Sequence, residues 1–539
     1  MKMKKYLSYT LALVLITGAC DQEVIELGPP PTCEELGNCP PPKCEGATAG
    51  TAVFTKFVAI GNSFVAGFQS GALFNDGQAS SMAKIVATQL ECVGGTTTFN
   101  QPDINSQNGY NVQLSVPGVI NLGRLILFDP DGPNGPRTAA PFPAGFPGSS
   151  VTCPAAVTTP PLPDPYNTAD LPTAFTGNKA ELNNFSVPLI YLGQSLIPDT
   201  GNPASPYYNP FWARFASQPG VKSMMQDALT AGGSFYLFWL GMDDVLLYAA
   251  GGADNAGTIQ MTTEANFNGQ YNGAIAAMLT GTTLKGVVGN IPNFTTLPYF
   301  YTVAWNQITL DAGTAGSLTT NLANNYNAFL AGMVGAGVIN ENEKAKRMLT
   351  YVVGKNGVLL ADEDLTDLSP YMVGPYAGLA PYARARQAKS TDLIPLSAGS
   401  VLGTCFGGSP NAVIGVSYPV GDKHALTPNE TTAILTRTAA FNAVISSAVS
   451  GSADRLALAD VNKAYGDFVT GKVLVLDNVA ITPSFPPPTG AFSEDGLHPN
   501  SRGYVFTANI FIDAINTKFG ATIPKASLAS KSGTALPIP

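Results

Sequence analysis

Short, fully apolar runs that alternate with helix-like segments are the feature that most restricts the fold of this 539-residue chain. Uninterrupted apolar runs of this length predict strands buried on both faces. They lie at residues 55–60, 235–240, 286–291 and 473–476. Apolar residues recur at helical spacing at residues 80–90, 427–450 and 503–519. Because strands that alternate with helices build parallel sheets covered by helices, the pattern predicts an α/β fold with a mostly parallel sheet.

The first twenty residues have the features of an export signal. A lysine-rich start precedes an apolar stretch, residues 7–19, that is too short to span a bilayer. The small residues before Cys20 resemble a bacterial lipoprotein signal, although Thr17 stands where Leu is usual. This resemblance implies a lipid on Cys20 and a place in the outer membrane of a bacterial envelope, on its periplasmic face or at the cell surface. An ordinary secretory cleavage is the alternative.

Composition divides the rest of the chain into a tether, a large domain and a tail. Residues 21–50 are rich in proline and predict an extended tether rather than a core. We expect one domain over residues 51–525 and a tail over 526–539. Within the domain, residues 128–175 are dense in proline and glycine, and residues 310–420 do not follow the strand–helix alternation. Both are interpreted as insertions.

Charge and cysteine content exclude several classes of function. Only 12 % of residues are charged and the net charge is −9, so the chain offers no basic surface for nucleic acid. Beyond Cys20, six cysteines remain, an even number that favours disulfides in an exported protein, with the pairing left open. They are Cys33, Cys39, Cys44, Cys92, Cys153 and Cys405. Their spacing is not that of a zinc site. We expect no metal, no cofactor and a monomeric protein.

Two distant segments carry residue types suited to nucleophilic catalysis. His498 is one of only two histidines in the chain, and Asp495 lies three residues before it. Such a carboxylate can orient an imidazole that acts as a general base near neutral pH. Ser63 follows the apolar run 55–60, and a serine hydroxyl becomes a good nucleophile when an imidazole accepts its proton. In a parallel sheet, reactive residues gather at the carboxyl ends of strands, which is where we expect Ser63, Asp243 and Asp244.

Four segments in order extend this pattern over most of residues 54–522. They are Gly61-Asn62-Ser63-Phe64, Asn183-Asn184-Phe185 through Leu189, Gly241-Met242-Asp243-Asp244 and Asp495-Gly496-Leu497-His498-Pro499. The ordered set resembles the SGNH (GDSL-like) hydrolases, in particular the large lipoprotein members of the Bacteroidetes type. The resemblance implies a three-layer α/β/α sandwich and ester hydrolysis through an acyl-enzyme. It also implies that Ser63 is the nucleophile and His498 the base, oriented by Asp495.

The oxyanion donors implied by this resemblance include two departures from the family pattern. The implied donors are the Ser63 backbone N–H, the residue at 189 and the residue at 243. Leu189 stands where the family usually has glycine, although a leucine still offers its backbone N–H. Asp243 stands where the family has asparagine, and an ionised carboxylate has no proton to donate. We therefore expect Asp243 to act only when neutral, in which case Asp243→Asn raises the rate of ester hydrolysis, most of all at high pH.

The sequence thus predicts an exported, lipid-anchored serine hydrolase that cleaves carboxylic esters of lipids, glycans or small alcohols. The alternative is a surface protein of the same fold that has weakened or lost catalysis and binds a glycan or lipid. Asp244 is expected to organise its turn. His424 has no partner pattern and is interpreted as a solvated loop residue, and the acids at 362–364 as a solvated surface run.

Overall fold

The structure is a computed structural model that describes most of the region after the expected tether. The described residues are 44–107, 109–111, 121–122, 124–125, 173–255, 257–485 and 488–533. Cys20 with its signal, and nearly all of residues 128–175, lie outside the described residues. Among the helices of the described part, none combines the length and the apolar character needed to cross a bilayer.

A four-stranded parallel sheet forms the centre of the molecule. Its strands are β1 (Phe57–Gly61), β4 (Phe235–Trp239), β5 (Lys285–Gly289) and β10 (Leu456–Ala459), in that spatial order. β1 and β4 pair in register from Phe57 opposite Phe235 to Gly61 opposite Trp239. Both strands are buried along their whole length, as their uninterrupted apolar sequences require. The predicted α/β fold with a parallel sheet is confirmed.

One predicted strand is not part of this sheet. The run at 473–476 forms β11 (Leu474–Leu476), which pairs antiparallel with β12 (Val479–Ile481) in a separate hairpin. The fourth parallel strand is β10, which the sequence analysis missed. β10 has the sequence Leu-Ala-Leu-Ala, in which small side chains dilute the apolar signal. The prediction for 473–476 was therefore right about the strand and wrong about its place.

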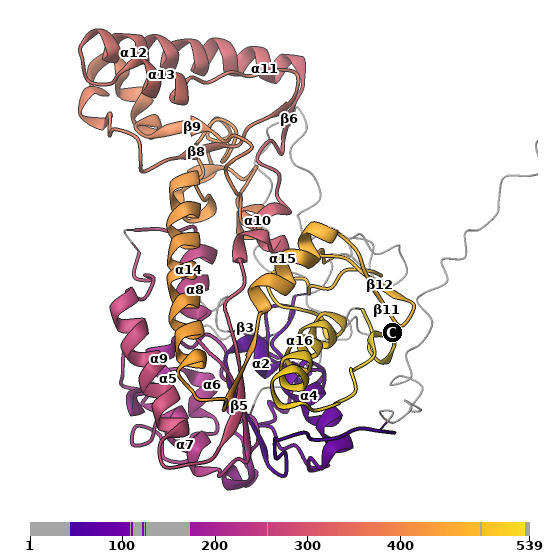
Figure 1. Cartoon of the computed structure of the whole chain (residues 1–539). Coiled ribbons are helices and arrows are strands. Elements are labelled where there is room, and N and C mark those ends of the chain that lie inside the picture. The colour runs from indigo at the N-terminus through magenta and orange to yellow at the C-terminus, as the bar shows by residue number, and fades with distance from the viewer. Residues whose placement is uncertain are drawn as a thin grey trace, which may run out of the picture.

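Helices lie on two sides of this sheet (Figure 1). The helices that belong to this part are α2 (Ser63–Ala66), α3 (Asn75–Ala79), α4 (Met82–Leu90), α5 (Leu192–Ser195), α6 (Pro210–Ala213), α7 (Met224–Thr230), α8 (Asp243–Ala250), α9 (Glu264–Leu279), α10 (Pro298–Tyr301), α14 (Pro428–Ser450), α15 (Val461–Gly471) and α16 (Ser501–Phe519). α16 contacts β5, β10 and α4, whereas α14 contacts α9 and β10. The helices predicted at 80–90, 427–450 and 503–519 correspond to α4, α14 and α16.

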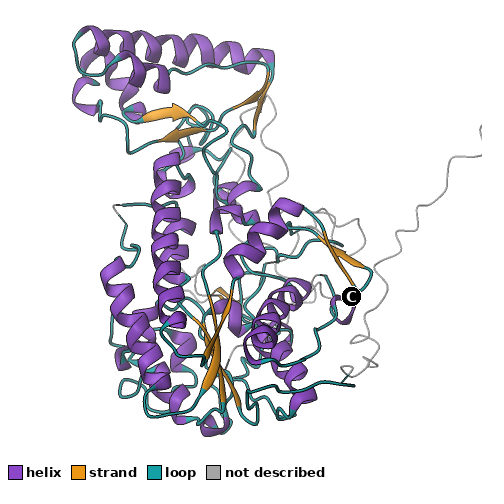
Figure 2. Ribbon diagram, in the orientation of Figure 1, coloured by secondary structure: helices purple, strands orange, loops and turns teal. Residues whose placement is uncertain are grey.

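A second hydrophobic core is built from residues 303–425, which overlap the segment expected as an insertion. The first core, around the sheet, draws instead on residues 52–300 and 426–528. The second part contains β6 (Ile308–Leu310), α11 (Ala312–Leu318), α12 (Asn324–Gly335), α13 (Glu341–Arg347), β7 (Gly354–Asn356), β8 (Leu359–Ala361) and β9 (Ala385–Gln387). Among the described residues, its strands pair within this part, β6 with β7 and β8 with β9. It lies at the far end of α14 from the central sheet, as Figure 2 shows.

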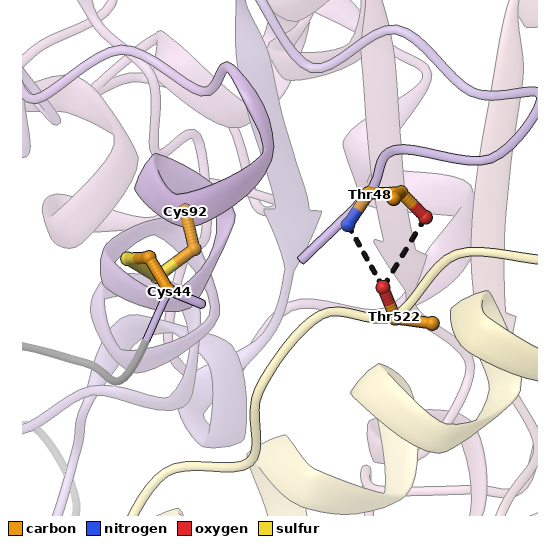
Figure 3. Close-up of a disulfide and its surroundings, with 4 residues drawn as sticks. All are labelled: Cys44, Thr48, Cys92 and Thr522. Carbon is orange, nitrogen blue, oxygen red and sulfur yellow. Dashed lines mark hydrogen bonds between the residues drawn. A yellow bond between two sulfur atoms is a disulfide. The ribbon is translucent and has the colours of Figure 1, made fainter. Parts of the chain in front are cut away.

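The start and the end of the described chain are held to the body of the molecule. A disulfide joins Cys44 to Cys92, just after α4 (Figure 3). Thr48 N donates to Thr522 Oγ1 over 2.8 Å, so the segment after Cys44 lies beside the segment that follows α16. Cys405 is disulfide-bonded as well. The sequence left the disulfide pairing open, and the Cys44–Cys92 bond settles it for these two cysteines.

Candidate active site

Ser63, His498 and Asp495 form a continuous hydrogen-bonded chain, although more than 430 residues separate the serine from the histidine. Ser63 Oγ lies 2.8 Å from His498 Nε2. His498 Nδ1 lies 2.8 Å from Asp495 Oδ2. With Nδ1 protonated and donating to the carboxylate, Nε2 is left to accept the proton of the serine hydroxyl. The side chains that the sequence analysis put together thus meet at hydrogen-bonding distance.

Asp495 holds His498 through both its backbone and its ring. Asp495 Oδ1 accepts hydrogen bonds from the backbone N–H groups of Leu497 and His498, at 2.9 and 2.8 Å. Asp495 Oδ2 accepts from Gly71 N at 2.9 Å in addition to the imidazole. Burial alone would raise the pKa of Asp495, but the charge of His498 and these hydrogen bonds hold that pKa below its usual value. The carboxylate is therefore ionised and can stabilise an imidazolium.

Two aromatic rings pack against the imidazole of His498. The ring centroids of Phe64 and Phe68 lie 4.9 and 4.8 Å from that of His498. Ser63 is 1 % and His498 3 % exposed, so little water reaches the pair. Exclusion of water strengthens the electrostatic interactions within such a site.

The turn after β1 presents Ser63 at the first position of α2. Gly61 is required there, because a Cβ at this position would lie 2.3 Å from Val65 Cγ2. Asn62 caps the helix: its Oδ1 accepts a hydrogen bond from Phe64 N at 3.2 Å. The Ser63 N–H, as the first of the helix, has no intrahelical acceptor and remains available.

The segment that carries Leu189 reaches the site along the free edge of β1. Phe185 N donates to Ala59 O at 2.8 Å, and Val187 N donates to Gly61 O at 3.0 Å. Leu189 then adopts φ = +57°, a left-handed conformation that favours glycine and costs a leucine roughly 1 kcal/mol. Leu189 therefore keeps the left-handed backbone conformation preferred by glycine, the residue usual at this position in the family.

The side chain of Asn209 holds the turn at Leu189 through hydrogen bonds to its backbone. Its Nδ2 donates to Pro188 O at 2.9 Å and to Leu189 O at 3.3 Å. Within the described part of the chain, neither the Ser63 nor the Leu189 backbone N–H donates a hydrogen bond. Both backbone N–H groups are thus without an acceptor in the described structure, as the donors to a developing oxyanion must be.

Asp243 connects the two turns. Its Oδ1 accepts a hydrogen bond from Asn62 Nδ2 at 3.1 Å, and its Oδ2 accepts from Ile190 N at 3.0 Å. Asn62 precedes the serine and Ile190 follows Leu189, so Asp243 fixes the residues next to both backbone donors. Burial, and after it the charge of Asp244, raise the pKa of Asp243 to about 7. Near neutral pH a substantial fraction of Asp243 is protonated.

Asp244 has a different set of partners and fits the organising role expected of it. Its Oδ2 accepts from Leu192 N at 2.8 Å and its Oδ1 from Thr262 Oγ1 at 2.6 Å. Burial raises the pKa of Asp244 to about 6, against the effect of these hydrogen bonds. Asp244 therefore anchors α5 and the start of α9 to the same turn as Asp243.

Two interpretations of polar residues outside this site were wrong. His424 is half-buried rather than solvated, its Nδ1 has no hydrogen-bond partner, and burial and the charge of Lys423 lower its pKa to about 4. Asp362 is 5 % exposed and pairs with Arg386 rather than lying in a solvated run. Sequence patterns did not reveal either environment, because both depend on contacts between segments far apart in the chain.

Several residues that shape the site were not predicted from the sequence. Asn62, Asn209 and Gly71 supply hydrogen bonds that hold the serine turn, the Leu189 turn and Asp495. Asn62 had a detectable signal, since it stands directly before the serine. Asn209 and Gly71 had none, because their partners are 20 or more residues away in the sequence.

Comparison with known proteins adds no identification. No model of a known protein family matches the chain, and no match is found among curated proteins or among solved structures.

Proposed function

We propose that this chain is a serine hydrolase that cleaves carboxylic esters through an acyl-enzyme on Ser63. The observation that carries the proposal is the pair of 2.8 Å contacts that link Ser63 Oγ to His498 and His498 to Asp495. In the proposed reaction, His498 accepts the hydroxyl proton as Ser63 attacks the ester carbonyl. His498 then returns the proton to the departing alcohol, and water repeats the sequence to release the acid.

In this proposal the oxyanion is held by the backbone N–H groups of Ser63 and Leu189, and Asp243 assists only when protonated. The absence of competing acceptors for those two groups in the described chain supports the first part. The raised pKa of Asp243, about 7, supports the second. We further propose that Asp243 positions the two backbone donors in both of its protonation states. It does so through its hydrogen bonds with Asn62 and Ile190.

The proposal extends to the family and the cellular setting. We infer a three-layer α/β/α hydrolase of the SGNH type, with a lipid on Cys20 as its membrane anchor in the outer membrane of a bacterial envelope. The order of the four sequence segments and the parallel sheet with helices such as α4, α14 and α16 support this assignment. The substrates proposed are esters of lipids, glycans or small alcohols, with no cofactor.

The test is hydrolysis of a short-chain nitrophenyl ester by the purified chain and two single variants. Ser63→Ala and His498→Gln are each expected to lower kcat by roughly 10⁴ or more, because neither residue works without the other. His424→Gln is the matched control, since it alters the only other histidine and leaves the hydrogen bonds among Ser63, His498 and Asp495 intact. Activity that survives Ser63→Ala unchanged would overturn the proposal.

The second candidate is a protein of this fold that binds a glycan or lipid ester without turnover, and Asp243 is the observation that favours it. An ionised carboxylate near the oxyanion would repel the developing charge. This candidate predicts a folded wild-type protein that hydrolyses no ester above about pH 8, where Asp243 is ionised, and that still binds a glycan or lipid ester.

A further inference from the structure

Three carboxylates from distant parts of the chain meet where the second core joins the body of the molecule. Glu363 and Asp422 belong to the segment that builds or borders the second core, and Glu430 lies in the first turn of α14. One carboxylate oxygen from each lies within 4.8 Å of the other two. Figure 1 shows α14 leaving the second core at this point and running back towards the sheet.

The most buried of the three, Glu430, has an oxygen with no partner. Glu430 is 6 % exposed. Its Oε2 accepts a hydrogen bond from Thr427 N at 2.6 Å, as part of a capping box, while its Oε1 is buried and has no hydrogen-bond partner. A buried carboxylate oxygen without a partner costs roughly 1–3 kcal/mol or more, so a group that satisfies it is expected.

The other two carboxylates are also sparingly partnered. Glu363 accepts a hydrogen bond from the Asn255 side chain. Within the described residues, no hydrogen bond or ion pair reaches the Asp422 carboxylate, and no lysine or arginine pairs with any of the three acids. The buried cations Arg347 and Arg386 are already paired, Arg347 with Glu343 and Arg386 with Asp362 and Asp392.

Unscreened negative charges at this spacing repel one another strongly. Burial, then the charges of Glu363 and Asp254, raise the pKa of Asp422 to about 7. Burial, with further contributions from Asp422 and Glu363, raises the pKa of Glu430 to about 8. The arrangement is therefore costly near neutral pH unless a positive charge sits among the carboxylates.

We propose that Glu363, Asp422 and Glu430 bind one hard divalent cation, of the class of Ca²⁺. Oxygen ligands alone, with carboxylates in an irregular array, suit Ca²⁺, which accepts variable geometry. Zn²⁺ prefers histidine and cysteine ligands, and neither residue type belongs to the cluster. Sequence spacing does not reveal this site, because its ligands are 8 to 67 residues apart and come from separate polar segments.

The position of the site implies a structural role. Gly252, just after α8, has φ = +77°, and a Cβ there would lie 2.3 Å from the Lys423 carbonyl carbon. The turn after α8 therefore packs directly against the backbone next to Asp422. A cation at the cluster joins the second core to α14 beside this turn, and α8 begins with Asp243 and Asp244 of the candidate active site.

The site is tested on the full chain after removal of metal with EDTA. Calorimetric titration with CaCl₂ is expected to give a single site, and about 5 mM CaCl₂ is expected to raise Tm by roughly 2–5 °C through preferential binding to the folded state. Terbium provides a second readout. Burial, and after it the charges of Glu430, Glu363 and Asp422, raise the pKa of Tyr248, so this ring lies near the three carboxylates and its excitation should sensitise Tb³⁺ bound there.

Two variants separate a cation site from a general salt effect. Asp422→Asn and Glu363→Gln are expected to abolish the calcium-dependent rise in Tm and the sensitised terbium signal. Each is also expected to raise Tm in EDTA, because one repelling charge is gone; this readout shows that the variant folds. Asp467→Asn removes an exposed acid at a surface pair with Lys463 and should leave the calcium response unchanged. The absence of a calcium response in the wild-type protein, or its persistence in both variants, would overturn the proposal.

Discussion

The loop that carries Asp495 and the turn that carries Asp243 place two buried aspartates in one site. Their hydrogen-bond partners and neighbouring charges shift their pKa values in opposite directions. Asp495 accepts four backbone or side-chain hydrogen bonds at 2.8 to 3.1 Å and faces an imidazole. Asp243 accepts two and has Asp244 beside it. The pKa of Asp495 is held below its usual value, whereas that of Asp243 is raised to about 7. Burial is common to both, so the partners decide the charge.

The largest effect should come from removing the charge of Asp495. Asp495→Asn keeps the size of the side chain but supplies an amide that no longer stabilises an imidazolium or fixes its tautomer. We expect kcat for ester hydrolysis to fall by roughly 10³–10⁴. The measurement is steady-state hydrolysis of a nitrophenyl ester at pH 8. A loss of less than tenfold would show that the two aspartates do not differ in the way the contacts imply.

The next effect concerns the donor–acceptor pair of Asn62 and Asp243. Asp243→Asn alone sets an amide N–H against either Asn62 Nδ2 or Ile190 N, both of which are donors to the present carboxylate. The double exchange Asn62→Asp with Asp243→Asn satisfies all of these groups: residue 62 still caps Phe64, residue 243 still accepts from Ile190, and an amide N–H is left free for the oxyanion.

We therefore expect the double variant to hydrolyse esters about 10-fold to 100-fold faster than the wild-type protein at pH 8–9, and faster than the single Asp243→Asn variant. The single variant should gain less than the double variant, because it leaves a donor without an acceptor. A double variant no faster than the wild type at any pH from 6 to 9 would show that Asp243 does not limit the reaction.

The dependence on pH sharpens the same contrast. Protonated Asp243 has a hydrogen to donate and ionised Asp243 has none, so the assistance it gives should be lost as pH rises through about 7. The ratio of double-variant to wild-type kcat is expected to increase by about tenfold between pH 6 and pH 9. Taking the ratio cancels ionisations that both proteins share. A ratio independent of pH would assign Asp243 a positioning role only.

The smallest effect is on stability. Because the pKa of Asp243 is raised in the folded state, its favourable neutral form contributes fully below about pH 4, and this contribution is lost as pH rises through about 7. In Asp243→Asn, the loss of unfolding free energy between pH 5 and pH 8 should be smaller by roughly 2 kcal/mol. Denaturant unfolding at both pH values measures it. Asp467→Asn, an exposed control, should not change this difference.

The sequence predicted those parts of the molecule whose signals are local. Continuous apolar runs gave β1, β4 and β5 because strands buried on both faces leave no polar alternation, and Ser63 followed from its place after β1. The pairing of His498 with Asp495 was also local, at a spacing of three residues. β10 was missed because alanine contributes little apolar signal to its four residues.

The burial and the partners of several ionisable side chains could not be predicted from the sequence. The protonation of Asp243 depends on Asn62, Ile190 and Asp244, two of which are 53 or more residues away. The partners of Asp362 and the burial of His424 likewise arise from packing within and around the second core. Such properties depend on three-dimensional neighbours that no spacing rule encodes.

Covalent labelling with a fluorophosphonate, followed by peptide mass spectrometry, tests the central claim most directly. An activated serine attacks the phosphorus, whereas an ordinary buried serine does not react. The account predicts a single adduct on Ser63 that is lost in His498→Gln and retained in His424→Gln. A folded wild-type protein that takes up no label, or that is labelled at another serine, would contradict the assignment of Ser63 as an activated nucleophile.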